Sequence, residues 1–131
     1  MLQTTDYNIK MLRKNVGIFT ERGDTIGFLL SKDGIVVIDA QFPDTAQHFI
    51  EAIKKTNIMP SQYLLNTHHH ADHTSGNIAF KGLIQHVAAH ENSLINQRAV
   101  AEKQNTLDKQ LLPDQTFDSE WKLKIGDEKI K

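Results

Sequence analysis

Apolar and polar residues alternate from Tyr7 to Leu12 with the period of two that is typical of a half-buried β-strand. Further strands are expected at residues 16–20 and 25–31, separated by turns that contain glycine and aspartate. The run Ile35-Val36-Val37-Ile38 is apolar and β-branched throughout, so it predicts a strand buried on both faces of a sheet. This strand ends at Asp39.

The spacing changes to that of a helix after this strand. Apolar residues then fall at Ala46, Phe49, Ile50 and Ile53. This pattern predicts a helix that begins with Asp44 as its N-cap, directly after Pro43, and ends near Asn57. His48 lies in this helix and is expected to face solvent.

The remaining pattern continues the alternation of strands and helices. Strands are expected at residues 63–65 and 83–89, helices at 77–80 and 91–104, and a β-hairpin from 121 through the turn at Gly126. This order predicts an α/β fold in one domain spanning residues 1–131. The second arm of the hairpin stops at Lys131, so we expect this domain to be partial, a truncated form of a longer one.

Composition narrows the classes of function. The chain has 131 residues, of which 39% are hydrophobic and 24% charged, with a net charge of −1 and no basic block, so we expect neither nucleic acid nor a membrane as partner. It has no cysteine, which excludes disulfides and thiolate metal sites. No signal peptide is recognisable in the first residues, and both the cytoplasm and, after processing, the periplasm stay candidates for its location.

Four of the seven histidines gather within one short segment, Thr67–Asn77, between a predicted strand and a predicted short helix. At an extended strand end, residues two apart point the same way, so His68 and His70 can present their imidazoles to one metal ion while His69 faces away. Asp72 and His73 follow a turn and can address a second point nearby. Imidazole and carboxylate ligands suit Zn²⁺, and also iron or manganese.

This spacing predicts a binuclear metal site rather than a solvated histidine-rich loop, which is the alternative. In two-metal hydrolases the ions lie about 3.5–4 Å apart and share a water that becomes the nucleophile. Gly76 would let the backbone pass close to the metals, and Asn66 or Thr67 could orient the imidazoles.

The segment resembles the H-x-H-x-D-H signature of the metallo-β-lactamase superfamily, with all four ligand positions filled, by His68, His70, Asp72 and His73. The stretches Ala89–Asn92 and Leu112–Phe117 are similar to the glyoxalase-II-like and cyclase-like hydrolase branches. The resemblance implies the N-terminal half of an αβ/βα sandwich, a mixed β-sheet with helices on one face. It also implies zinc, two ions per complete site, and a role for Asp39 in supporting the ligands.

The resemblance also implies what the chain lacks. The family takes its remaining metal ligands from the second half of the sandwich, and His48, His86 and His90 are not expected to replace them. We therefore expect a homodimer or a missing C-terminal half to cover the exposed sheet face. We expect the chain alone to have weak hydrolase activity or none.

The expected function is that of a metal-dependent hydrolase for a small-molecule substrate. Metal-bound hydroxide would attack the carbonyl of an ester, thioester or lactam, and Asp72 would orient the water as well as bind metal. One alternative is a non-catalytic metal-binding half-domain that dimerises through the site or the exposed sheet. A further alternative is an oxidoreductase branch of the same fold that holds iron.

Overall fold

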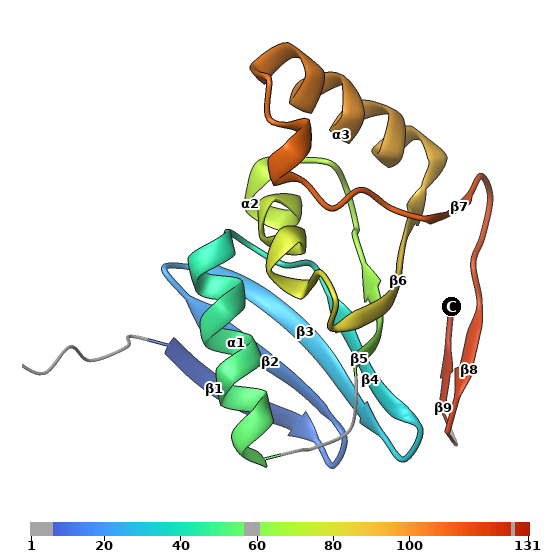
Figure 1. Ribbon diagram of the computed structural model, residues 1–131. Helices are drawn as coiled ribbons and strands as arrows, with labels where there is room; N and C mark the ends of the chain where they lie inside the picture. The colour runs from blue at the N-terminus through green and yellow to red at the C-terminus, as the bar shows by residue number, and fades with distance from the viewer. Residues whose placement is uncertain (1–6, 57–60, 127) are drawn as a thin grey trace, which may run out of the picture.

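A mixed seven-stranded sheet forms the centre of the protein in the computed structural model, which describes residues 7–56, 61–126 and 128–131 (Figure 1). In sheet order its strands are β1 Tyr7–Arg13, β2 Val16–Glu21, β3 Asp24–Ser31, β4 Gly34–Ile38, β5 Ser61–Leu65, β6 Ile84–His90 and β7 Gln115–Phe117. Neighbours from β1 to β4 are antiparallel, and neighbours from β4 to β7 are parallel. The predicted α/β class and mixed sheet are confirmed.

Helices fill the connections between the parallel strands, because such strands cannot be joined by a tight turn. These elements are α1 Pro43–Thr56, α2 Ala71–Thr74, the 3-10 helix η1 Ser75–Phe80, α3 Glu91–Gln104 and the 3-10 helix η2 Leu107–Lys109. A separate hairpin follows, β8 Leu123–Ile125 and β9 Glu128–Ile130. None of the helices in these described ranges is long and apolar enough to cross a membrane.

The central strand β4 is buried on both faces, as its continuous apolar run predicts. On one face Ile35 and Val37 pack in the main core, into which α1 contributes its apolar stripe, centred on Phe49. On the other face Val36 packs with Leu29 and with residues of the β8–β9 hairpin. The hairpin therefore covers part of the sheet face that we expected to be exposed, on the side opposite α1 (Figure 1).

Helix α1 begins two residues earlier than its sequence pattern suggests, because a helix with Asp44 as its N-cap would have Thr45 as its first residue. Pro43 is its first residue, so Asp44 lies inside the first turn and is not the N-cap. The fixed φ of proline suits the first helical position, which explains the shift. The hydroxyl of Thr45 accepts a hydrogen bond from the backbone N–H of Phe42 at 3.1 Å. The N–H group directly before the helix therefore has a hydrogen-bond partner. The predicted end at Asn57 lies outside the described residues.

His48 is half-buried, and the expectation that it faces solvent is wrong. Its Nδ1 lies 2.8 Å from Oε1 and 3.0 Å from Oε2 of Glu21, whose side chain is only 5% exposed. A buried carboxylate is costly without a hydrogen-bonding partner, and His48 supplies one from α1. The pair thus ties α1 to β2, away from the histidine-rich segment.

Gly76 is placed where two chain segments touch. Its N–H donates to the carbonyl of Gln41 at 2.6 Å, and a Cβ on Gly76 would collide with the carbonyl oxygen of Ala40 and lie 2.9 Å from that of Gln41. The close approach is therefore to the loop that follows β4. Only glycine permits this contact between the β4 loop and the segment that carries the histidines.

We predict that Gly76→Ala lowers the free energy of unfolding by about 1–3 kcal/mol, because the new methyl group must push two backbone segments apart. Urea-induced unfolding measures the change. Gly27→Ala is the matched control, because a Cβ there meets Ile38 at an ordinary contact distance of 3.5 Å. Equal losses in the two variants would contradict the steric explanation.

Candidate metal centre

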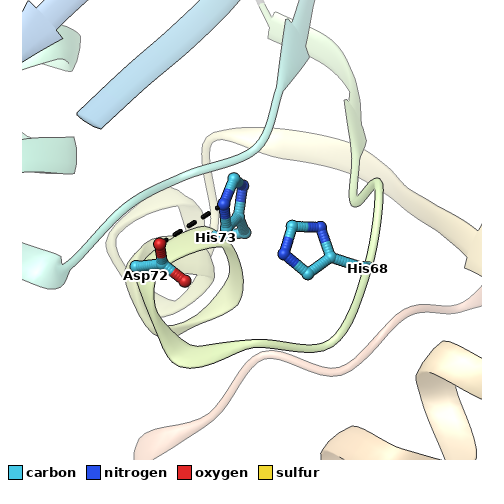
Figure 2. A group of neighbouring side chains, drawn as sticks. All are labelled: His68, Asp72 and His73. Atoms are coloured by element: carbon cyan, nitrogen blue, oxygen red, sulfur yellow. Dashed lines mark ion pairs between the residues drawn. The ribbon is translucent and has the colours of Figure 1, made fainter. Parts of the chain in front are cut away.

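Three side chains of the histidine-rich segment converge beyond the end of β5. The chain leaves β5 at Leu65, and His70 leads into the short helix α2, which carries Asp72 and His73. Ligand atoms of His68, Asp72 and His73 all lie within 4.8 Å of one another (Figure 2). Within the described ranges of the chain, this is the one cluster of three such side chains that could hold a metal ion.

Asp39, at the end of β4, orients the imidazole of His73. Its side chain is 8% exposed, and Oδ2 lies 2.8 Å from His73 Nδ1. Because an ionised carboxylate can only accept, Nδ1 of His73 donates to it, and in the neutral imidazole Nε2 is then the nitrogen that offers a lone pair to a metal. This Nε2 faces Asp72, whose Oδ2 lies 3.4 Å away (Figure 2). This geometry agrees with the supporting role that the resemblance implies for Asp39.

The same carboxylate orients His68 through Thr67. The hydroxyl of Thr67 donates to Asp39 Oδ2 at 2.7 Å, so its oxygen accepts from His68 Nδ1 at 3.0 Å. In a neutral His68, Nε2 is then the nitrogen that offers a lone pair to a metal. These tautomers follow from the hydrogen-bond network, in which each donor needs an acceptor. Asp39 thereby prepares both histidines for the same kind of contact.

Asp39 achieves this position through an uncommon backbone conformation. Its φ is +63°, in the left-handed region that aspartate tolerates better than most residues. Its N–H donates to the carbonyl of Leu65 at 2.8 Å, and the next N–H, of Ala40, donates to the carbonyl of His73 at 2.8 Å. The turn after β4 is thus bonded to the two sides of the segment whose histidines it orients.

His70 lies near the cluster but outside it. Its ring centre is 4.9 Å from that of His68 and 4.8 Å from that of His69. The expected arrangement placed His68 and His70 at one point and Asp72 and His73 at another, whereas the structure groups His68 with Asp72 and His73. Residues 67 and 68 lie in a bend instead of an extended strand end, so the strand geometry that would point His68 and His70 the same way is not present. His70 as a metal ligand stays a prediction.

Two pockets flank the segment. The smaller, about 190 Å³, is lined by His69, His70 and residues of α2 and α3. The larger, about 410 Å³, opens beside Thr67 between the sheet and the chain around β7–β9. Its apolar lining includes Leu65, Phe117 and Trp121. The volume of the larger pocket is in the range usual for small-molecule sites.

The two later histidines are engaged elsewhere. Nδ1 of His86 lies 2.9 Å from Oδ2 of Asp114. His90 caps α3, where its Nδ1 accepts from the N–H of Asn92 at 3.0 Å and its Nε2 donates to the carbonyl of Asp118 at 2.9 Å. Neither lies in the metal-ligand cluster, in agreement with the sequence analysis.

Comparison with known proteins assigns the family. The sequence model of the metallo-β-lactamase superfamily matches residues 20–129. The chain belongs to this superfamily. A hydroxyacylglutathione hydrolase from Chelativorans sp. (strain BNC1) is 47% identical over 66 residues, which are 48% of this chain and 24% of that protein. The resemblance to the glyoxalase-II-like branch therefore has a counterpart among curated proteins.

Solved metallo-β-lactamase structures share the fold. The enzyme from Pontibacter korlensis superimposes with a TM-score of 0.73 at 21% identity, covering 95% of this chain and 58% of its own. Metallo-β-lactamase IND-7 gives a TM-score of 0.68 at 21% identity, covering 97% of this chain and 59% of its own. This metallo-β-lactamase-fold chain thus spans a little over half the length of these structures and about a quarter of the curated relative.

We predict that Asp39→Asn weakens binding of Zn²⁺ or Co²⁺ by about 10–100-fold, the range usual for groups that orient metal ligands. An asparagine would place its NH₂ group, which is a donor, opposite one of the groups of Thr67 or His73 that now donate to the carboxylate of Asp39. Competition with a chromophoric chelator measures the affinity. Asp33→Asn is the control, because Asp33 also accepts a backbone N–H but lies at the other end of β4. Unchanged affinity in Asp39→Asn would refute this role.

A second prediction concerns the His86–Asp114 pair. Partial burial raises the pKa of Asp114, but hydrogen bonds from His86 and from the N–H of Val87, with the charge of protonated His86, outweigh it and leave that pKa below its ordinary value of 3.8. A lowered pKa means that the unfolded chain binds more protons in acid. The pair therefore stabilises the folded protein at pH values above 3.8. This stabilisation is lost as the pH falls through the lower pKa that Asp114 has in the folded protein.

We accordingly expect Asp114→Asn to be less stable than the unchanged protein at about pH 5, with the difference shrinking towards about pH 3. Urea-induced unfolding across this range gives the comparison. Asp108→Asn, at an exposed carboxylate, controls for the change in net charge. A stability difference that does not vary with pH would show that the hydrogen bonds of Asp114 do not depend on its ionisation.

Proposed function

We propose that this superfamily member carries the metal centre of a metal-dependent hydrolase, which acts on the carbonyl carbon of a small ester, thioester or lactam. One observation carries the proposal: His68, Asp72 and His73 converge within 4.8 Å, while hydrogen bonds that lead to Asp39 engage Nδ1 of both imidazoles and leave Nε2 as the nitrogen that would bind a metal. A histidine that serves only as a surface residue has no need of such an arrangement.

Two imidazoles and a carboxylate fit a divalent metal ion, with zinc as the first choice and iron or manganese as alternatives. A catalytic zinc site ordinarily uses three protein ligands and keeps one position open, which the half-exposed cluster would allow. A second ion, with His70 as a further ligand, belongs to the same proposal. When bound, the metal supplies Lewis-acid polarisation of a carbonyl and lowers the pKa of a water molecule.

The residues of the chain would do the rest of the work. The carboxylate of Asp72, with Oδ2 3.4 Å from His73 Nε2, is exposed enough to orient a water molecule and to accept its proton. The pocket beside Thr67 would hold the apolar part of a small substrate against Phe117 and Trp121.

A thioester is the substrate class to test first. The relative that is 47% identical over 66 residues is named a hydroxyacylglutathione hydrolase. The lactamase structures, at 21% identity, show only a shared fold. We therefore place hydroxyacyl thioesters before lactams and simple esters.

The test begins with metal binding and continues with hydrolysis. We expect the chain to bind Zn²⁺, and any hydrolysis of a hydroxyacylglutathione to rise with metal loading and to vanish with a chelator. Replacing a residue that only orients a metal ligand usually weakens metal binding by about 10–100-fold. His68→Ala and His73→Ala should weaken it more than this, because each substitution removes a metal ligand. His86→Ala removes an imidazole outside the cluster and should change neither property.

The outcomes separate the two readings of the site. A chain that binds no divalent ion, or whose hydrolysis survives His68→Ala, would overturn the proposal. Tight metal binding without turnover of thioester, ester or lactam would favour the alternative of a non-catalytic metal-binding unit. In that case the mass in solution with and without metal shows whether two copies share the ion.

A further inference from the structure

Two buried asparagines lie at the two ends of the segment that carries the metal cluster. Asn66 directly precedes Thr67, and Asn77 directly follows Gly76. Their side-chain amides exchange two hydrogen bonds: Asn66 Nδ2 donates to Asn77 Oδ1 at 3.1 Å, and Asn77 Nδ2 donates to Asn66 Oδ1 at 2.7 Å. The pair therefore joins the end of β5 to the start of η1, and residues 67–76 form a loop closed at its base.

The pair is anchored to the surrounding elements. Gln97 on α3 donates to Asn66 Oδ1 at 3.2 Å and to Ser93 Oγ at 3.0 Å, and all of these side chains are buried. Asn77, which is fully buried, also donates to the carbonyl of Leu111 at 3.2 Å. The backbone N–H of Asn66 donates to the carbonyl of Ala88 on β6 at 3.0 Å. The base of the loop is thus fixed from three directions.

Burying side-chain amides costs free energy unless hydrogen-bonding groups of the protein replace the water that they lose. What they add over apolar side chains is direction: a hydrogen bond restricts both distance and angle. Here the restricted distance is the one between the strand end that leads to His68 and the helical turn that carries Asp72 and His73. None of the four buried side chains contacts a metal-ligating side chain in the described interactions, so any effect on the metal must act through position.

We propose that the Asn66–Asn77 pair positions the metal ligands, holding His68 at the spacing from Asp72 and His73 that a metal needs before the metal arrives. A loop with fixed ends has less freedom to lose on binding, so the affinity for the ion is higher. Gln97 is a secondary part of this device, because it orients the amide of Asn66. The inference rests on the proposed function, because one of the two measurements that test it is the affinity for a metal ion.

The test compares Asn77→Ala with a core variant of matched stability. Phe19→Leu on β2 removes buried apolar volume from the main core and leaves every hydrogen bond of the loop in place. We expect Asn77→Ala to lower the affinity for Co²⁺ by about tenfold or more. We also expect it to speed hydrogen exchange at the amides of residues 67–76 in metal-free protein. Phe19→Leu, at a similar free energy of unfolding, should change neither.

The same comparison states what would overturn the proposal. If Asn77→Ala matches Phe19→Leu in both Co²⁺ affinity and exchange, the amides only fill the core. If Asn77→Ala does not fold, Asn66→Ala replaces it, since that change breaks both hydrogen bonds of the pair from the β5 side. An Asn66→Ala protein that behaves like Phe19→Leu then refutes the role.

Failure of the proposed function gives a different result. In that case the unchanged protein binds no Co²⁺ at all, and hydrogen exchange in residues 67–76 decides alone whether the pair orders the loop.

Discussion

The carboxylate of Asp39 is the contact on which the candidate metal centre depends. It accepts three hydrogen bonds, from the N–H and hydroxyl of Thr67 and from Nδ1 of His73. Through Thr67 it also determines which nitrogen of His68 carries the proton. One buried charge thereby sets the tautomers of two imidazoles, and a metal needs both of them in that form.

The sheet explains why this carboxylate is in reach. Strands β4, β5 and β6 are parallel neighbours, so the turn after β4 and the loop after β5 emerge at the same edge, as is usual for ligand sites in open α/β sheets (Figure 1). The two segments then touch closely enough that only glycine fits at position 76. The sequence model of the metallo-β-lactamase superfamily, which matches residues 20–129, includes both of these segments.

Apolar and polar burial have separate tasks in this fold. The aromatic and aliphatic core between α1 and the sheet provides the driving force for folding, and it is indifferent to small changes of angle. The amides of Asn66, Asn77 and Gln97 lie on the other side of the metal segment and restrict its geometry. The candidate site therefore combines a rigid platform with ligands that remain half-exposed to a substrate.

The sequence by itself determined the elements in which apolar residues recur at regular spacing, which are strands β1 to β6 and helices α1 and α3. It also determined the metal motif and, through that motif, the family. Tertiary structure alone decided the three-residue strand β7, the grouping of His68 with Asp72 and His73, and the partner of His48. Periodicity reports which residues are buried but not which distant groups they meet. Asp39 and His73 lie 34 residues apart, and Asn66 and Gln97 lie 31 apart, so their hydrogen bonds exist only once the sheet has brought them together.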